Sequence, residues 1–70
     1  MIEVFKTNVS TSTEADRVAS HLRTVLCGAH VNFDLQDCDN ILRLEGIQAA
    51  DLPVVERGLA QLGFECEILV

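Results

Sequence analysis

The chain has 70 residues, of which 49% are hydrophobic, and its 11 acidic and 5 basic side chains give a net charge of −6. This length supports one domain with a single small core, and the composition is that of a globular protein rather than a disordered one. The negative charge would repel a phosphate backbone and an anionic lipid surface, so neither nucleic acid nor a membrane is an expected partner.

The N-terminal half begins with a predicted strand and a predicted helix. Residues Ile2 to Thr7 are rich in strand-forming side chains. From Ala15 to Leu26 the apolar residues recur every three or four positions, which is the spacing of one helical face. Gly28, just after the last turn, is the expected C-cap residue of this helix.

The middle of the chain predicts a β-hairpin. Val31, Phe33 and Leu35 alternate with polar residues, the period of a half-buried strand. Turn-forming residues follow at 37–40, and Ile41 to Glu45 resumes the strand character before Gly46. We therefore expect two adjacent antiparallel strands.

A second helix is predicted from apolar positions on one helical face, namely Leu52, Val55, Leu59 and Leu62. Asp51 is the expected N-cap, Pro53 fits the first turn, and Gly63 ends the helix. Gly58 inside it costs about 1 kcal/mol relative to alanine. At the C-terminus a strand is predicted, in which Phe64, Cys66, Ile68 and Val70 alternate with Glu65, Glu67 and Leu69.

The order strand, helix, strand, strand, helix, strand is the split β-α-β arrangement of ferredoxin-like folds, since right-handed crossovers leave few alternatives. We expect residues 1–70 to form one α+β domain with βαββαβ topology. Its four-stranded antiparallel sheet should have the order 4-1-3-2, with both helices on one face. The other face is left for water or for a partner.

Two segments resemble a known family. Residues 8–14 read Asn-Val-Ser-Thr-Ser-Thr-Glu between the first strand and helix, and Leu62-Gly63-Phe64 precedes the last strand. With Val18 and Leu22 at the matching helical spacing, they resemble the heavy-metal-associated domains, which carry copper or zinc with the motif Gly-Met-Xaa-Cys-Xaa-Xaa-Cys. The resemblance spans nearly the whole chain and implies the same ferredoxin-like fold.

Placing Val9 on the methionine of that family puts Thr11 and Glu14 on its two metal-binding cysteines. Because Cu(I) needs thiolate or thioether ligands, this loop is not expected to hold it. A threonine followed three residues later by glutamate is instead a capping box at a helix start. Thr13 with Asp16 is a competing frame for the same cap. We expect neither a metal nor a cofactor.

The cysteines, Cys27, Cys38 and Cys66, are odd in number and widely spaced. They indicate reduced thiols in a cytoplasmic protein rather than disulfides, and no apolar run reaches the roughly 20 residues that span a bilayer. Cys27 should lie at the opposite end of the sheet from Cys38, and Cys66 should point inward. Two flanking aspartates should raise the pKa of the Cys38 thiol, so a reactive nucleophile is not predicted. The histidines, His21 and His30, form no cluster with the thiols.

The uncovered face of the predicted sheet carries a candidate interaction surface, made of Ile2, Val4, Lys6, Ile41, Arg43 and Leu69. The last strand is expected to bring Leu69 beside Ile2, which gives a small apolar patch ringed by charges. Ordinary mixing of apolar residues on a protein surface explains such a patch equally well.

We expect a binding module, not an enzyme, that uses the uncovered face or a sheet edge to meet a protein partner or a second copy of itself. The alternative is a small-molecule-sensing regulatory domain whose ligand loop contains Asn8, Ser10, Thr11, Ser12, Glu14 and Cys38. A metal-binding domain with altered ligands is a less favoured reading. An acylphosphatase-like enzyme shares the topology, but its first loop needs an arginine, which residues 8–14 lack.

Overall fold

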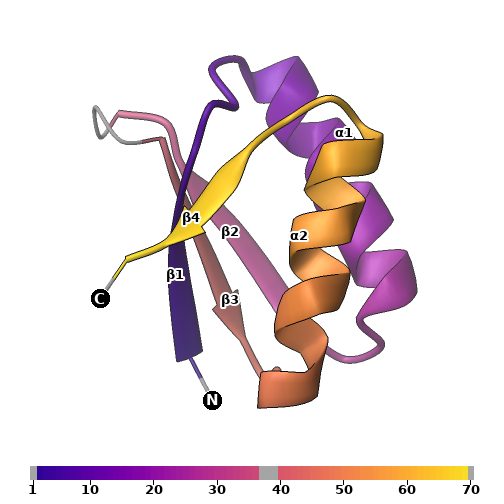
Figure 1. Cartoon of the computed structure of the whole chain (residues 1–70). Helices are drawn as coiled ribbons and strands as arrows, with labels where there is room; N and C mark the ends of the chain where they lie inside the picture. Colours follow the sequence, from indigo (N-terminus) through magenta and orange to yellow (C-terminus); the bar gives the residue numbers. More distant parts are fainter. Residues whose placement is uncertain (1, 37–39, 70) are drawn as a thin grey trace.

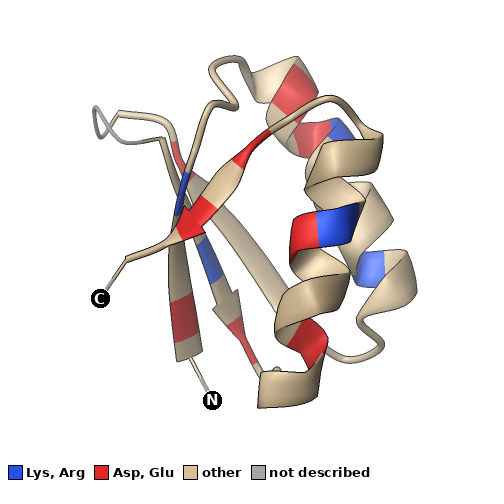
Figure 2. Ribbon diagram, viewed as in Figure 1, with Lys and Arg blue, Asp and Glu red and all other residues tan. Residues whose placement is uncertain are grey.

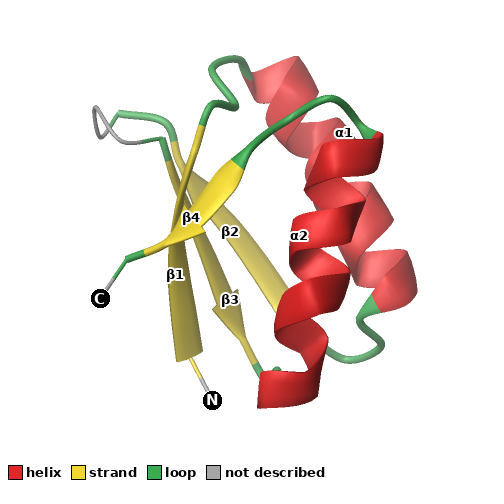
Figure 3. Cartoon of the chain, viewed as in Figure 1, coloured by secondary structure: helices red, strands yellow, loops and turns green. Residues whose placement is uncertain are grey.

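The computed structural model describes residues 2–36 and 40–69. Within these residues, four strands form one antiparallel sheet and two α-helices cover one of its faces (Figure 1). The elements in chain order are β1 (Ile2–Thr7), α1 (Ser12–Val25), β2 (His30–Asp34), β3 (Ile41–Glu45), the 3₁₀ turn η1 (Ala49–Asp51), α2 (Leu52–Gln61) and β4 (Cys66–Ile68). The sheet order is β2-β3-β1-β4, so the predicted ferredoxin-like α+β topology is confirmed (Figure 3).

The core lies between the sheet and the two helices. Alternation along β3 buries Leu42 and Leu44 completely, while Ile41 and Arg43 take the other face. The apolar stripe of α1 and that of α2 meet these strand residues, and the core residues on the two helices are Ala15, Val18, Ala19, Leu22, Val55 and Leu59. The side chains predicted to point inward from β2 and β4 pack against this core, as expected.

β1 lies inside the sheet, between β3 and β4, and its buried residues alternate with exposed ones toward its end. Phe5 and Val9 are fully buried, and Thr7 is the buried polar residue between them. The Thr7 hydroxyl donates to the Asn40 carbonyl at 2.7 Å and accepts from the Val9 N–H at 3.2 Å. These bonds satisfy the buried hydroxyl and tie the end of β1 to the start of β3.

One of the predicted helix caps is wrong, and another is confirmed in its position only. Asp51 is the N-cap residue of α2, as predicted, but it also ends η1, and its carboxylate accepts from the Gln48 N–H at 2.9 Å instead of from an N–H of α2. At the end of α1, Leu26 is the C-cap residue, and its N–H donates to the Leu22 carbonyl at 2.7 Å. Gly28 lies two residues farther on with φ of 84°, where the chain turns back toward β2.

The last crossover ends as expected but leads into a shorter strand. Gly63 has φ of 89°, and the Phe64 N–H donates to the Leu59 carbonyl at 2.9 Å, which completes a Schellman cap on α2. Since the Phe64 amide serves the helix, strand pairing begins only at Cys66 and continues to Ile68. Val70 lies outside the described residues.

In the described part of the chain, neither helix has the length and apolar character that crossing a bilayer requires.

Candidate functional site

The loop between β1 and α1 is organised by a capping box, as predicted. Thr11 is the N-cap residue, and its Oγ1 accepts from the Glu14 N–H at 3.1 Å. The Glu14 carboxylate accepts in return from the Thr11 N–H at 3.2 Å. The competing frame is wrong, because Thr13 and Asp16 both lie inside α1. Thr11 and Glu14 therefore fix the start of α1.

The Glu14 carboxylate also holds the preceding residue. It accepts from both the backbone N–H and the hydroxyl of Ser10, each at 3.2 Å. These donors, with the Ser10 backbone N–H contributing most, hold the pKa of Glu14 below its ordinary value. The ionised carboxylate is thus part of the loop structure.

Other polar groups of this loop bind the start of β4. The Asn8 side-chain oxygen accepts from the Glu65 N–H at 2.8 Å, and the Asn8 N–H donates to the Glu65 carbonyl at 3.4 Å. The loop therefore uses Asn8, Ser10, Thr11 and Glu14 for internal hydrogen bonds. Ser12 is exposed in the first turn of α1, and Cys38 lies outside the described residues.

The thiols and histidines of the described chain do not converge. Among residues 2–36 and 40–69, no three histidine, cysteine or carboxylate side chains are placed to share a metal ion. Cys27 is exposed in the connection between α1 and β2, at the opposite end of the sheet from the capped loop (Figure 1). Burial, with a smaller contribution from the Glu56 charge, raises the pKa of the Cys66 thiol, which disfavours the reactive thiolate. His21 is half-buried and His30 is exposed.

The second candidate is the sheet surface away from the helices, which we call the open face and define by Ile2, Val4, Lys6, Ile41, Arg43 and Leu69. β1 and β3 pair Val4 with Arg43 and Lys6 with Ile41, and β1 and β4 pair Lys6 with Glu67. The Leu69 N–H donates to the Val4 carbonyl at 2.9 Å. Leu69 therefore lies directly opposite Val4, and Ile2, the residue expected beside it, is two residues farther along β1.

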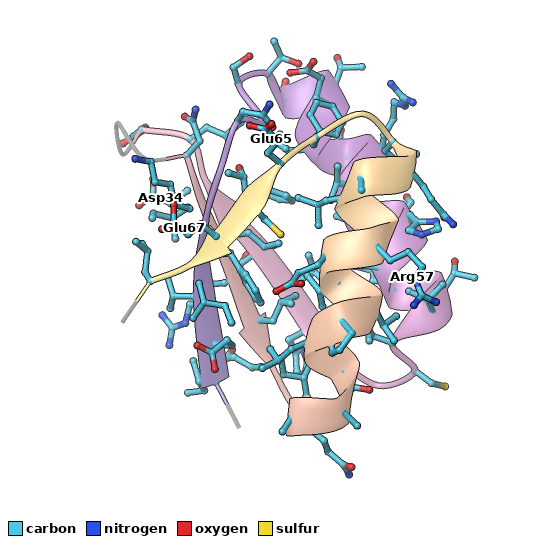
Figure 4. All side chains as sticks on the ribbon, viewed as in Figure 1. Asp34, Arg57, Glu65 and Glu67 are labelled. Atoms are coloured by element: carbon cyan, nitrogen blue, oxygen red, sulfur yellow. The ribbon has the colours of Figure 1, made fainter. Side chains whose placement is uncertain are left out.

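Apolar and charged side chains are interleaved on the open face. Ile2 is 56% exposed and Leu69 37% exposed, whereas Val4 and Ile41 are half-buried. Arg43 lies 3.6 Å from the Glu45 carboxylate. Figure 2 shows that both signs of charge occur on the strands. The labelled Asp34 and Glu67 lie on the side of the sheet away from the helices, and Arg57 extends from α2 (Figure 4).

Two hollows flank the sheet, one at each edge. At the β4 edge, a hollow of about 600 Å³ is bordered by Lys6, Glu56, Phe64 and Cys66. Burial raises the pKa of the Cys66 thiol in this hollow, which disfavours the nucleophilic thiolate.

At the other edge, a groove of about 480 Å³ lies between α1 and β2, and we call it the α1–β2 groove. Asp16, Ala19 and Arg23 line it from the helix, and Val31 and Phe33 from the strand. This groove was not among the predicted sites. Its available signal was the pair of opposite charges, Asp16 and Arg23, seven residues apart on one helix.

No protein-family model matches the chain, and comparison with characterised proteins and with solved structures gives no significant match.

Proposed function

We propose that the chain is a non-enzymatic binding module, built on a scaffold like that of the heavy-metal-associated domains, that meets a protein partner through the open face. The observation that supports this function is the register of the central strands. This register gathers three aliphatic side chains around Val4 on the uncovered side of the sheet. Ile2 is two residues away on β1, Leu69 is opposite on β4, and Ile41 is diagonal on β3.

The open face has the anatomy of a small protein-binding surface. An apolar centre supplies the free energy of burial, about 25 cal/mol for each Å² removed from water. Charged residues at its border, Lys6, Arg43 and Glu67, favour one orientation of the partner and raise the association rate more than the affinity. A partner with an apolar patch bordered by both signs of charge fits this surface.

Val25 provides a comparison within the same molecule. It is a large hydrophobic residue with 44% exposure, and it lies on α1, away from the open face. A single exposed residue of this kind is ordinary on a folded protein. The open face differs because its apolar side chains are neighbours across three strands.

The small-molecule reading of the β1–α1 loop has less support. Its hydrogen-bonding groups at Asn8, Ser10 and Glu14 already bind within the molecule, so a polar ligand would have to displace those bonds. The same argument applies to a metal held by Thr11 and Glu14, since Thr11 Oγ1 and Glu14 Oε1 already accept the hydrogen bonds of the cap.

The test begins with affinity capture of the wild-type chain from its own cells, followed by titration of the purified partner. Ile2→Glu and Val4→Glu should each weaken binding about tenfold or more, because a carboxylate would be buried in an apolar contact. Ile2→Glu is the safer variant for folding, since Ile2 is largely exposed.

Ala50→Glu is the matched control, as it adds the same charge at an exposed position of η1. It should leave the affinity unchanged, and circular dichroism should show that all three variants are folded. Equal affinities for the wild type, Ile2→Glu and Val4→Glu would contradict the proposed function.

A further inference from the structure

The two edges of the sheet differ in how they are protected from pairing with another strand. β4 has three residues, and a strand this short limits pairing. β2 is longer and regular, since it pairs with β3 through five consecutive residue pairs without a bulge. It contains neither proline nor lysine, and Asp34 is its one residue with a formal charge. An accessible edge of this kind can accept another strand.

The surface beside this edge is shaped for close approach. The α1 residues along the α1–β2 groove include Ser12, Ala15 and Ala19, whose small side chains leave room for another chain. Apolar atoms of Val31 and Phe33 form the strand side of the groove.

The two charged α1 residues of the groove, one acidic and one basic, follow each other along the helix axis. Asp16 lines the half of the groove near the start of α1, and Arg23 lies in the last turn of the same helix. Seven residues are about two helical turns, so the two side chains project from the same flank about 10 Å apart along the helix axis. A binding partner that matches this surface must carry the same two charges in the reverse order.

We propose that the partner at this edge is a second copy of the chain, joined about a two-fold axis with β2 antiparallel to β2 and α1 antiparallel to α1. A two-fold axis reverses the direction of each element, so Asp16 of one copy meets Arg23 of the other, and the reciprocal pair forms by symmetry. The α1–β2 groove is self-complementary in this arrangement. This dimer goes beyond the proposed function of the open face and uses different residues.

The reversed order of charges selects a second copy over an unrelated extended peptide. A peptide strand could pair with β2, but it would not by itself supply a helix flank bearing both charges at the matching spacing. One strand and one helix flank give a small interface, so we expect a dimer that exchanges with monomer at micromolar concentrations.

The test is a charge exchange followed by sedimentation velocity over a range of concentrations. Asp16→Arg and Arg23→Glu should each raise the dimer dissociation constant about tenfold or more, because both symmetric ion pairs become repulsive. The double variant Asp16→Arg/Arg23→Glu should recover the wild-type dissociation constant, since both pairs form again with the charges exchanged.

The double variant also separates the interface from the helix itself. A cation near the start of a helix and an anion in its last turn are both unfavourable to the helix dipole, so the monomer of the double variant should be the least stable of the set. Recovery of the dimer together with a lower thermal stability is therefore expected only for an interfacial role.

A wild-type chain that stays monomeric at millimolar concentration would overturn the dimer. So would a dimer that the single charge changes leave intact while Val4→Glu abolishes it, because self-association would then use the open face. The proposed function would survive either result, since partner binding is tested with Ile2→Glu and Val4→Glu.

Discussion

The Glu14 carboxylate accepts several hydrogen bonds from the loop that leads into α1. It accepts from the backbone amides of Ser10 and Thr11 and from the Ser10 hydroxyl, all at 3.2 Å. Hydrogen bonds to an ionised acceptor are stronger than those to a neutral one, so the ionisation of Glu14 is coupled to the structure of this loop. The coupling predicts a dependence of stability on pH.

Replacing Glu14 with glutamine should reduce stability at neutral pH and have less effect in acid. The pKa of Glu14 is lowered in the folded chain, so the ionised carboxylate stabilises the fold above its unfolded pKa. This contribution is lost as the pH falls through the folded pKa. Urea unfolding of the wild type and Glu14→Gln should therefore show a difference that shrinks below about pH 4.5.

Glutamine keeps an acceptor at this position, so the difference reports the charge rather than the complete loss of the cap. Glu56→Gln removes one charge from the exposed face of α2 and corrects for the change in net charge. A difference between wild type and Glu14→Gln that stays constant from neutral to acid pH would contradict the link between charge and cap.

Local signals at single residues were predictable where their partners are close in the sequence. The capping box was read correctly from Thr11 and Glu14, because both hydrogen bonds lie within one helical turn. Asp51 was correctly placed at the N-cap of α2, but the use of its carboxylate to close η1 was not predicted, because the sequence does not reveal the 3₁₀ turn that precedes the helix.

At the scale of elements, Gly58 of α2 leaves space for the His21 side chain of α1. A Cβ placed on Gly58 would lie 3.1 Å from His21 Cδ2 and 3.2 Å from His21 Nε2. The imidazole ring therefore occupies the space beside the glycine. A glycine that appeared unfavourable from its helix propensity alone makes room for a side chain of the neighbouring helix.

The contact predicts that the effect of Gly58→Ala depends on His21. Alanine should gain about 1 kcal/mol of helix propensity, but in the wild type the displaced ring should cancel most of that gain. In a His21→Ala background, the same substitution should stabilise the chain by about 1 kcal/mol. Urea unfolding of the four variants in a double-mutant cycle measures this coupling.

Ser20 lies beside His21 on α1 but is not among the nearest neighbours of Gly58, so Ser20→Ala serves as the control background. It should leave the effect of Gly58→Ala as it is in the wild type. Equal effects of Gly58→Ala on stability with and without His21 would show that the imidazole ring moves aside without a loss of free energy, which would contradict the coupling.

The elements themselves followed from periodicity, whereas the candidate surfaces depended on register. The inward residues of β1, including Phe5 and Thr7, followed from placing Val9 on the methionine of the heavy-metal-associated domains, because the residues Ile2 to Thr7 do not by themselves show which face of the strand is buried. The place of Leu69 was not predicted, since a strand can slide by two residues without changing its faces. The α1–β2 groove requires the relative positions of two elements, which neither pattern specifies on its own.

For the whole molecule, the two proposed surfaces are compatible with each other. Pairing through β2 would extend the sheet and leave the open face of both copies uncovered. Two open faces on the same side of one continuous sheet would bind a repetitive or dimeric partner with higher apparent affinity than a single domain. The edge contact would then increase the avidity of the open face, although the two surfaces share none of the residues that define them.

The whole domain depends on one small core, so truncating a single buried side chain should remove a large part of its stability. Leu22 is fully buried on α1, whereas Val25 on the same helix is 44% exposed. Leu22→Ala should cost about 3 kcal/mol, which is most of the roughly 3–5 kcal/mol available to a domain of this size. Val25→Ala should change stability by about 0.5 kcal/mol or less, because little apolar surface is lost from the core.

Circular dichroism during urea unfolding measures both variants. With the stability nearly exhausted, Leu22→Ala should show a shortened folded baseline and a substantial unfolded population in buffer alone. If Leu22→Ala keeps a midpoint close to that of Val25→Ala, then the stability must come from outside this core. Concentration separates the two sources, because a dimer would raise the midpoint as the protein concentration rises, whereas the core contribution is independent of concentration.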